Sequence, residues 1–353
     1  MVSPNPLFSA MPPVTPFVAP EEIERNQGSP FRLRLGANES VFGPSPRARL
    51  AAGEFNPAHY GDPKSFLLRE ALPYPSDHLI VASGIDELLS LFCRAFAAPG
   101  DVAVTTEGTY PTFAFGATGA GLTLRKAPYR EFRPDLDRLA KLTQGAKIVY
   151  LANPDNPTGA LLPAQELAAF RQNLPNDCLL LLDEAYADFV PADDLPTFSI
   201  QDPGVVRLRT FSKAHGLAGY RVGYAIAHPD HAATLDKIRL HFGVNGPGQA
   251  AALASLADKD YLENIIRQTI AGREALADIG RRAGLRPLPS STNFVLFDTG
   301  ETTDALLENL LRQGVFVRKA ATGGLRVTVG RADQLAAFEQ ALFRAIAETI
   351  RTS

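Results

Sequence analysis

Short apolar runs alternate with stretches of helical spacing through the first two thirds of the chain. The runs predict six strands, at 79–82, 102–105, 122–125, 147–151, 179–182 and 205–208. Apolar residues recur at helical spacing between several of them, at 86–97, 110–117 and 163–172. Strands this short and this continuously apolar are typical of a sheet buried on both faces. The pattern therefore predicts an α/β fold, with a mostly parallel sheet sandwiched by helices.

The pattern changes after a glycine-containing break at 243–248. Longer helical patterns then alternate with few strands, which predicts a smaller α+β domain. The helices are expected at 249–257, 261–280 and 333–349, and the strands at 292–297 and 325–329.

Three segments are predicted from these patterns. Residues 1–44 form an N-terminal arm and part of the small domain, residues 45–245 form the large domain, and residues 246–353 form the small C-terminal domain. The first 30 residues are rich in proline, and we expect an ordered arm there, with a disordered tail as the alternative.

Composition narrows the class of protein. The chain has 353 residues and a formal net charge of −3, which gives no basic surface for nucleic acid or an anionic membrane. No apolar run approaches the roughly 18 residues that would span a bilayer, and the N-terminus lacks the pattern of a secretory signal. Cys93 and Cys178 lie in apolar segments and are predicted to be buried thiols. We expect a reduced, cytoplasmic protein without a metal site.

Candidate chemistry follows the predicted strand at 205–208. Lys213 lies next to Ser212, with Thr210 before it and Arg221 after it. A lysine amine forms an imine with an aldehyde, while hydroxyls and a guanidinium suit a phosphate. A Ser-Lys pair alone is more often a solvated surface pair, so this interpretation depends on what the other strand ends supply.

The other strand ends carry matching groups, since ligands of open parallel sheets bind outside the carboxyl ends of the strands. Gly84, Ile85 and Asp86 open a helix after the strand at 79–82, and a helix N-terminus offers free N–H groups to a phosphate. The alternative is that Ser83 or Asp86 only caps the helix.

An aromatic, an amide and a carboxylate complete the set. Tyr110 follows the strand at 102–105 and either stacks on a flat ring or packs in the core. Asn156 lies in a rigid loop with two Asn-Pro pairs, where its amide is suited to a ring oxygen. Asp183 directly follows four leucines and needs a cationic partner, for which a protonated pyridine nitrogen is suitable. Tyr186 lies three residues further on, within reach of a ring hydroxyl.

Together these motifs resemble those of the fold-type I pyridoxal-phosphate enzymes. They are similar to the class I/II aminotransferases, most closely the histidinol-phosphate aminotransferase branch, over nearly the whole chain. The motifs are NPDNPTG (153–159), DEAY (183–186), SKAHGLAGYRVGY (212–224), STNF (291–294) and LRVTVG (325–330).

The resemblance implies an aspartate-aminotransferase-like fold and pyridoxal 5'-phosphate as the cofactor. It implies a ping-pong transfer of an amino group from histidinol phosphate, or an aromatic or other amino acid, to a 2-oxo acid. An amino-acid (phosphate) decarboxylase of the same fold is the alternative.

The resemblance also implies a role for each cofactor-site residue. Lys213 matches the lysine that holds the cofactor covalently and later moves the proton, and Asp183 matches the partner of the pyridine nitrogen. Asn156 and Tyr186 match the groups on the ring 3-oxygen, and Tyr110 matches the stacking aromatic. The phosphate would be held by Gly84, Ile85, Asp86, Thr210, Ser212, Arg221 and, across the interface of a homodimer, Tyr60.

Substrate-binding residues follow from the same resemblance. Arg326 matches the arginine that binds the substrate's anionic group, and Asn38 also matches the family pattern. Arg318 stands at the position of a second phosphate-binding arginine, with a solvated strand charge as the alternative. Phe17 departs from the branch, which usually has a substrate-binding tyrosine there. This difference favours a pocket altered toward an aromatic or other hydrophobic amino acid.

Overall fold

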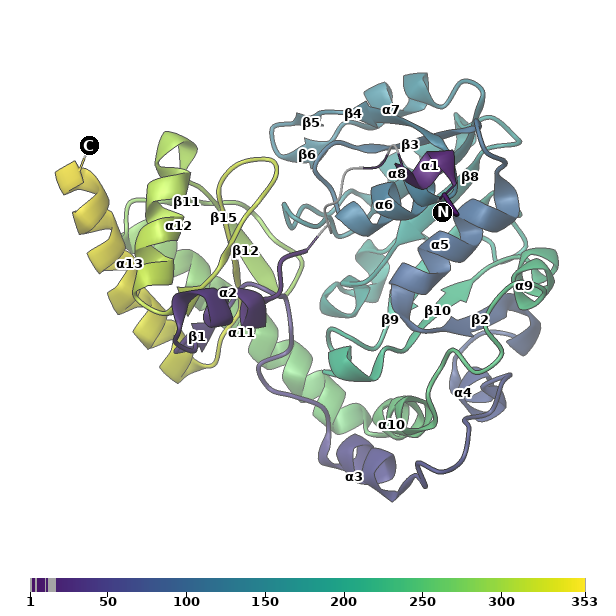
Figure 1. Cartoon of the computed structure of the whole chain (residues 1–353), viewed down its shortest axis with the longest axis horizontal. Helices are drawn as coiled ribbons and strands as arrows, with labels where there is room; N and C mark the ends of the chain where they lie inside the picture. The colour runs from purple at the N-terminus through teal and green to yellow at the C-terminus, as the bar shows by residue number, and fades with distance from the viewer. Residues whose placement is uncertain (1, 4, 10, 12–16, 353) are drawn as a thin grey trace.

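Two sheets of unequal size organise the chain. The structure is a computed structural model that describes residues 2–3, 5–9, 11 and 17–352. Within them, a seven-stranded sheet lies in the larger part of the molecule and a four-stranded sheet in the smaller part. The long helix α11 (Lys259–Arg282) runs from the larger part toward the smaller one (Figure 1).

The large sheet is mostly parallel, as the apolar runs predicted. Its strand order is β2-β10-β9-β8-β7-β3-β4, and β10 is antiparallel to both of its neighbours. All six predicted strands are present, whereas β10 was not predicted. The strands are β2 (Leu79–Ala82), β3 (Val102–Thr106), β4 (Thr123–Ala127), β7 (Ala146–Ala152), β8 (Leu179–Asp183), β9 (Val205–Thr210) and β10 (Gly223–Ile226).

Helices cover both faces of this sheet. Successive side chains of a strand point to opposite faces, so neighbouring residues pack against different helices. In β8, Leu181 joins a cluster with residues of α5 (Gly84–Phe96), α6 (Pro111–Gly119) and α9 (Pro229–Asp236). The next residue, Leu182, joins a second cluster with α7 (Leu136–Leu142) and α8 (Ala164–Gln172). A helix-covered parallel sheet presents its polar strand ends, rather than its faces, to a ligand.

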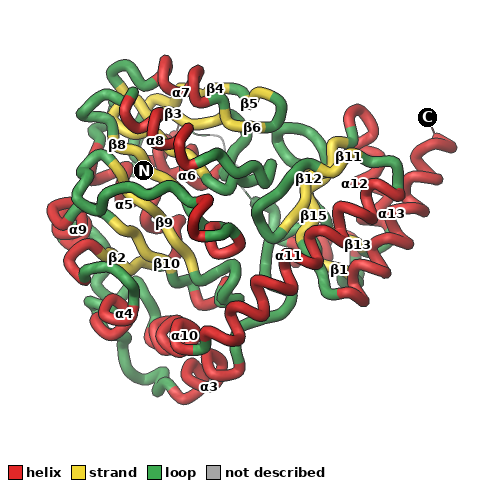
Figure 2. The backbone as a smooth tube through the Cα atoms, turned by 180° about the vertical axis from the view of Figure 1, so that it is seen from behind, coloured by secondary structure: helices red, strands yellow, loops and turns green. Residues whose placement is uncertain are grey.

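Three helices pack together at the β2 end of the sheet, where Figure 2 shows them from behind. They are α3 (Pro46–Glu54), α4 (Phe66–Ala71) and α10 (Gly246–Ala257). Ala48, Leu68 and Ala252 from these helices share an apolar cluster with Val81 of β2. The domain boundaries at 44 and 245 stay a prediction, and α10 itself packs on the side of the large sheet.

The smaller part combines residues from both ends of the chain. Its antiparallel sheet has the order β11-β12-β15-β14, and β1 (Leu33–Arg34) pairs in parallel with β13 (Val315–Phe316). The predicted strands and helices of this region are present with shifted ends. The elements are β11 (Arg286–Pro287), β12 (Phe294–Asp298), β14 (Arg318–Lys319), β15 (Leu325–Thr328), α12 (Thr303–Arg312) and α13 (Ala332–Thr352).

Short elements complete the described chain. The arm contains α1 (Pro6–Ser9) and α2 (Pro20–Gln27), and β5 (Tyr129–Arg130) and β6 (Arg133–Pro134) form a small hairpin after β4. Cys93 and Cys178 are buried, as predicted, and burial raises the pKa of each thiol to about 12. No helix in the described ranges is long and apolar enough to cross a membrane.

Candidate active site

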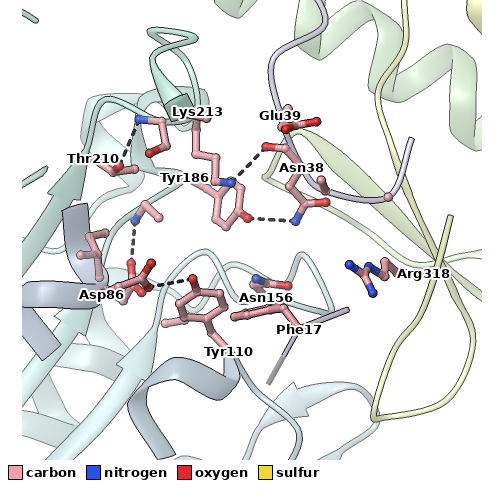
Figure 3. A pocket seen from close by; sticks show the side chains of 18 of the residues that line it. Phe17, Asn38, Glu39, Asp86, Tyr110, Asn156, Tyr186, Thr210, Lys213 and Arg318 are labelled. Atoms are coloured by element: carbon pink, nitrogen blue, oxygen red, sulfur yellow. Dashed lines mark hydrogen bonds between the residues drawn. The ribbon is translucent and has the colours of Figure 1, made fainter. Parts of the chain in front are cut away.

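A cavity of about 450 Å³ lies where the strand ends of the large sheet face the N-terminal arm and the small sheet (Figure 3). Fourteen predicted site residues line it, and Gly84 and Tyr60 do not. The lining residues are Phe17, Asn38, Ile85, Asp86, Tyr110, Asn156, Asp183, Tyr186, Thr210, Ser212, Lys213, Arg221, Arg318 and Arg326. The polar groups that the sequence distributes over more than 300 positions therefore meet in one place.

Lys213 projects into this cavity from the segment that follows β9. Its Nζ donates a hydrogen bond to the main-chain oxygen of Asn38, 3.1 Å away. Burial, together with the positive charge of Arg326, lowers the pKa of Lys213 to about 8. A substantial fraction of the side chain is therefore the free amine at mildly basic pH, which is the form that attacks a carbonyl.

Asp183 ends β8 and is 4% exposed. Its carboxylate accepts hydrogen bonds from Tyr150 Oη at 2.8 Å and from the N–H of Ala185 at 3.0 Å. Both donors are neutral, and burial raises the pKa of Asp183 to about 6. A buried carboxylate held in this way is stabilised by a cation that lies against it.

Tyr150 was missed in the sequence analysis. It lies inside the apolar run of β7 and is fully buried, so the pattern indicated only a core residue. The one available signal was chemical, because a buried tyrosine hydroxyl usually needs a hydrogen-bond partner. Here that partner is Asp183.

A guanidinium lies at the N-terminus of α5. Arg221 places Nη2 3.0 Å from Asp86 Oδ2 and Nη1 3.4 Å from Ser212 Oγ. A Cβ on Gly84 would lie 2.5 Å from Arg221 Nη2, and Gly84 has φ +83°, so only glycine fits here. The cationic group, the hydroxyl and the helix N-terminus together form an anion site.

The side chain and the main chain of Asp86 contribute to this site in different ways. Its carboxylate pairs with Arg221 and also accepts a hydrogen bond from Tyr110 Oη at 2.8 Å (Figure 3). Its side chain therefore orients a cation and an aromatic, and only its main-chain N–H is suited to an anion. Ser83 is the N-cap residue of α5, but its side chain makes no capping hydrogen bond, so the capping alternative is wrong for Ser83.

Two aromatic rings form one wall of the cavity. The ring of Tyr110 lies 5.7 Å from that of Phe17, measured between centroids, with 39° between their planes. Burial and the nearby Asp86 raise the pKa of Tyr110 well above its usual value, so its hydroxyl stays neutral. The N-terminal arm therefore reaches the large-sheet side of the cavity.

Asn38 connects several groups at the opposite wall. It is 2% exposed, and its Nδ2 donates to Tyr186 Oη at 2.9 Å. Its Oδ1 accepts from Thr328 Oγ1 at 3.1 Å, and its main-chain oxygen accepts from Asn293 Nδ2 at 3.0 Å as well as from Lys213. Asn38 thus fixes the relative positions of Tyr186 and Lys213.

Two arginines of the small sheet face the cavity. Arg326 donates from Nη1 to Asn156 Oδ1 at 2.6 Å and from Nη2 to the main-chain oxygen of Gly36 at 2.9 Å. Its buried Nε has no hydrogen-bond partner among the described residues. Arg318 donates from Nη2 to the main-chain oxygen of Val18 at 2.5 Å, and burial lowers its pKa. Arg318 therefore lines the cavity but is only partly buried, so the solvated strand charge remains the alternative to phosphate binding.

Tyr60 lies outside the cavity of its own chain. Its side chain is 80% exposed, and its ring centroid is 4.6 Å from that of Phe242. Leu240, Phe66 and Leu67 are also exposed. Within one chain, Tyr60 therefore does not contribute to this cavity.

The fold and the cavity define a transaminase. A partly free lysine amine faces a buried carboxylate and an anion site on a helix-covered parallel sheet, and residues 35–342 match the family model described as aminotransferase class I and II. Because this match covers most of the chain, the chain belongs to that family.

Two similar proteins carry the same name. The chain is 38% identical over 341 residues to a histidinol-phosphate aminotransferase of Anaeromyxobacter sp. (strain Fw109-5). The alignment covers 92% of this chain and 94% of that protein. It also resembles the crystal structure of histidinol-phosphate aminotransferase from Sinorhizobium meliloti in complex with pyridoxal-5'-phosphate. That match has a TM-score of 0.92 and 38% identity and covers 97% of each chain.

A more distant structure supports the fold alone. An aspartate aminotransferase mutant from Thermus thermophilus matches with a TM-score of 0.82 at 22% identity, covering 98% of this chain and 100% of that one. The aspartate-aminotransferase-like fold expected from the sequence is thereby confirmed. The decarboxylase alternative is not favoured, because the family model and the relatives are aminotransferases.

Proposed function

We propose that this chain is a pyridoxal-5'-phosphate-dependent aminotransferase whose amino donor is histidinol phosphate. The acceptor is a 2-oxo acid. The observation that carries the proposal is the position of the Lys213 amine, in a cavity that is also lined by the anion-site residues Arg221 and Ser212 and by the buried Asp183.

The residues present fit this cofactor at three places. Arg221, Ser212 and the N-terminus of α5 suit its phosphate. Asp183, which has only neutral hydrogen-bond donors, suits a protonated pyridine nitrogen. Lys213, with its pKa near 8, suits the aldehyde. The bound cofactor supplies an electron-withdrawing ring that acidifies the α-hydrogen of the donor.

Side chains of this chain perform the remaining work. Lys213 is the base that takes the α-proton and returns it, because its amine lies within the cavity and is half neutral near pH 8. Tyr110 and Asn156, which both line the cavity, would orient the cofactor ring. Tyr186, held by Asn38, adds a hydroxyl donor to the ring oxygen.

Substrate selection depends on the two arginines and the arm. Arg326 is placed for the substrate's anionic group, and Arg318 is a second arginine that suits the same group when it is a phosphate. A phosphate ester satisfies the second arginine, and the relatives named histidinol-phosphate aminotransferase support that choice. Phe17 supplies an apolar wall instead of a hydroxyl donor, so an aromatic amino acid is the second candidate donor.

A homodimer is also part of the proposal. Tyr60, Phe66, Leu67, Leu240 and Phe242 are exposed although they are large and apolar or aromatic, which suits an interface with a second copy. In that dimer Tyr60 reaches the phosphate site of the other subunit. The Tyr60→Ala variant is expected to bind the cofactor more weakly, and sedimentation of the wild-type chain as a monomer would contradict this part.

The free thiols support a reducing, cytoplasmic location.

Chemical trapping tests the function. The cofactor-loaded chain is reduced with sodium borohydride, which fixes any lysine–cofactor imine, and its peptides are then mapped. We expect the label on the peptide that contains Lys213. Lys147, which is half-exposed in a surface ion pair with Asp177, is the internal control and should stay unlabelled. Label spread over surface lysines, with none on Lys213, would overturn the proposal.

A further inference from the structure

A group of buried hydrogen bonds lies beside the cavity rather than in it. Its centre is Asp155, the residue before Asn156 in the loop after β7, which is 1% exposed and does not line the cavity. Its carboxylate accepts hydrogen bonds from Tyr129, Thr109 and Thr158. None of these four residues lines the cavity, and the proposed function gives them no part.

The carboxylate joins separate segments of the chain. Tyr129 Oη, from β5, lies 3.1 Å from Oδ1 and 3.0 Å from Oδ2 of Asp155. Thr109 Oγ1, from the turn after β3, lies 3.3 Å from Oδ1. Thr158 donates from its N–H at 3.1 Å and from Oγ1 at 2.8 Å to Oδ2. These donors surround both oxygens, which a buried carboxylate needs in order to stay ionised.

The same group leads directly to two residues that face the cavity. Thr109 immediately precedes Tyr110, and Thr109 Oγ1 also lies 3.3 Å from the main-chain oxygen of Asn156. The side chain of Asn156 in turn accepts a hydrogen bond from Arg326 at 2.6 Å. The network therefore links the turn that carries Tyr110 to the loop that carries Asn156.

We propose that Asp155, Thr109 and Tyr129 are positioning residues, which hold Tyr110 and Asn156 in the orientation that binds the cofactor ring. The proposal rests on the proposed function, because it concerns the same cofactor. A buried carboxylate that loses a donor carries a large penalty, so its donors are held in place and the two loops cannot shift independently. Site side chains need such support, because small displacements of a contact weaken it strongly.

The test compares two substitutions at one position. Thr109→Val keeps the shape of the side chain and removes the hydroxyl, whereas Thr109→Ser keeps the hydroxyl. Three quantities are measured for each: the pyridoxal-phosphate dissociation constant, the absorption spectrum of the bound cofactor, and the melting temperature of the cofactor-free protein. We expect Thr109→Val to raise the dissociation constant about 10-fold, the equivalent of one or two buried hydrogen bonds, and to shift the spectrum. Thr109→Ser should restore both.

A second pair of variants keeps the proposal testable if Thr109→Val folds poorly. Tyr129→Phe removes a hydroxyl bonded to Asp155, and Tyr261→Phe removes one bonded to the main-chain oxygen of Phe42, outside this network. Only Tyr129→Phe is expected to weaken cofactor binding.

Two contrary results are distinguishable. Lower melting temperatures for Thr109→Val and Tyr129→Phe, with unchanged dissociation constants and spectra, would show a merely structural network and overturn the positioning role. Failure of the wild-type chain to bind the cofactor would overturn the proposed function, and the positioning role with it.

Discussion

Replacing Asp183 with asparagine is predicted to stabilise the cofactor-free protein while weakening cofactor binding. The carboxylate is buried with neutral hydrogen-bond donors, so it is costly to ionise until a cation faces it. Asparagine has nearly the same shape and no charge. The substitution therefore removes the cost in the empty site and also removes the partner of the pyridine nitrogen.

The magnitude follows from the pKa of Asp183. Burial raises it from 3.8 to about 6, and a shift of about two units corresponds to about 3 kcal/mol as an upper limit. Because the folded-state pKa lies above the unfolded value, the folded protein holds the proton more tightly. Stability of the wild-type apoprotein therefore falls as pH rises from about 4 to about 6 and stays lower above that. The Asp183→Asn variant lacks this loss.

Thermal unfolding of the cofactor-free proteins across this pH range is the assay. For a chain of 353 residues that unfolds as one unit, 3 kcal/mol corresponds to a melting-temperature gain of about 4 °C. The gain should appear above pH 6 and vanish near pH 4. Asp177→Asn, which alters an exposed ion pair with Lys147, is the control and should show no such pH-dependent gain.

Adding pyridoxal phosphate should reverse the order of the two melting temperatures, because a ligand adds more stability to the protein that binds it more tightly. The wild type should then melt at the higher temperature. An Asp183→Asn apoprotein that is less stable than the wild type at pH 7, or that gains as much from the cofactor, would refute the reasoning.

Three further outcomes follow from the site. The rate at which the apoprotein captures pyridoxal phosphate should rise with pH and level off above about 8, since only the neutral Lys213 amine attacks; a flat profile between pH 6 and 9 would argue against this. Arg318→Ala should raise KM for histidinol phosphate by about 10- to 100-fold, the loss of a charge-assisted contact, with little effect on phenylalanine; equal losses would remove its phosphate-specific role. Glu184→Gln should destabilise the protein by about 3–5 kcal/mol, because the fully buried Glu184 carboxylate accepts from Arg207 at 2.9 Å and Arg209 at 2.8 Å; an unchanged urea midpoint would contradict it.

The large sheet could be predicted because its strands carry their own signal. A run such as 179–182 is four leucines long and is buried on both faces, so periodicity and burial agree. Asp183 could be identified as a candidate site residue because it is a charged residue directly after this apolar run. Strand β10 carried no such signal, since it is short, begins with glycine and pairs in the antiparallel direction with β9 and with β2, which is distant in sequence.

The contacts between side chains could not be predicted in the same way. The sequence placed the helix N-terminus at Asp86 near a phosphate, but it did not predict that the Asp86 carboxylate would accept hydrogen bonds from Arg221 and Tyr110. Tyr150 lies within an apolar strand, a position that predicts only a core residue. Asp155 lies in the NPDNPTG motif, in which only Asn156 was assigned a role. These partners depend on which segments the fold brings together, and local patterns do not specify that.

A half-reaction tests the central claim most directly. The cofactor-loaded chain is mixed with one donor at a time and no acceptor, and the products and cofactor absorbance are followed. With histidinol phosphate we expect one equivalent of the oxo product per subunit, loss of the absorbance, and its return when a 2-oxo acid is added. Bleaching by aromatic amino acids alone would keep the transaminase and reassign its donor. Release of carbon dioxide without an oxo product, or no change with any donor, would contradict amino transfer at Lys213.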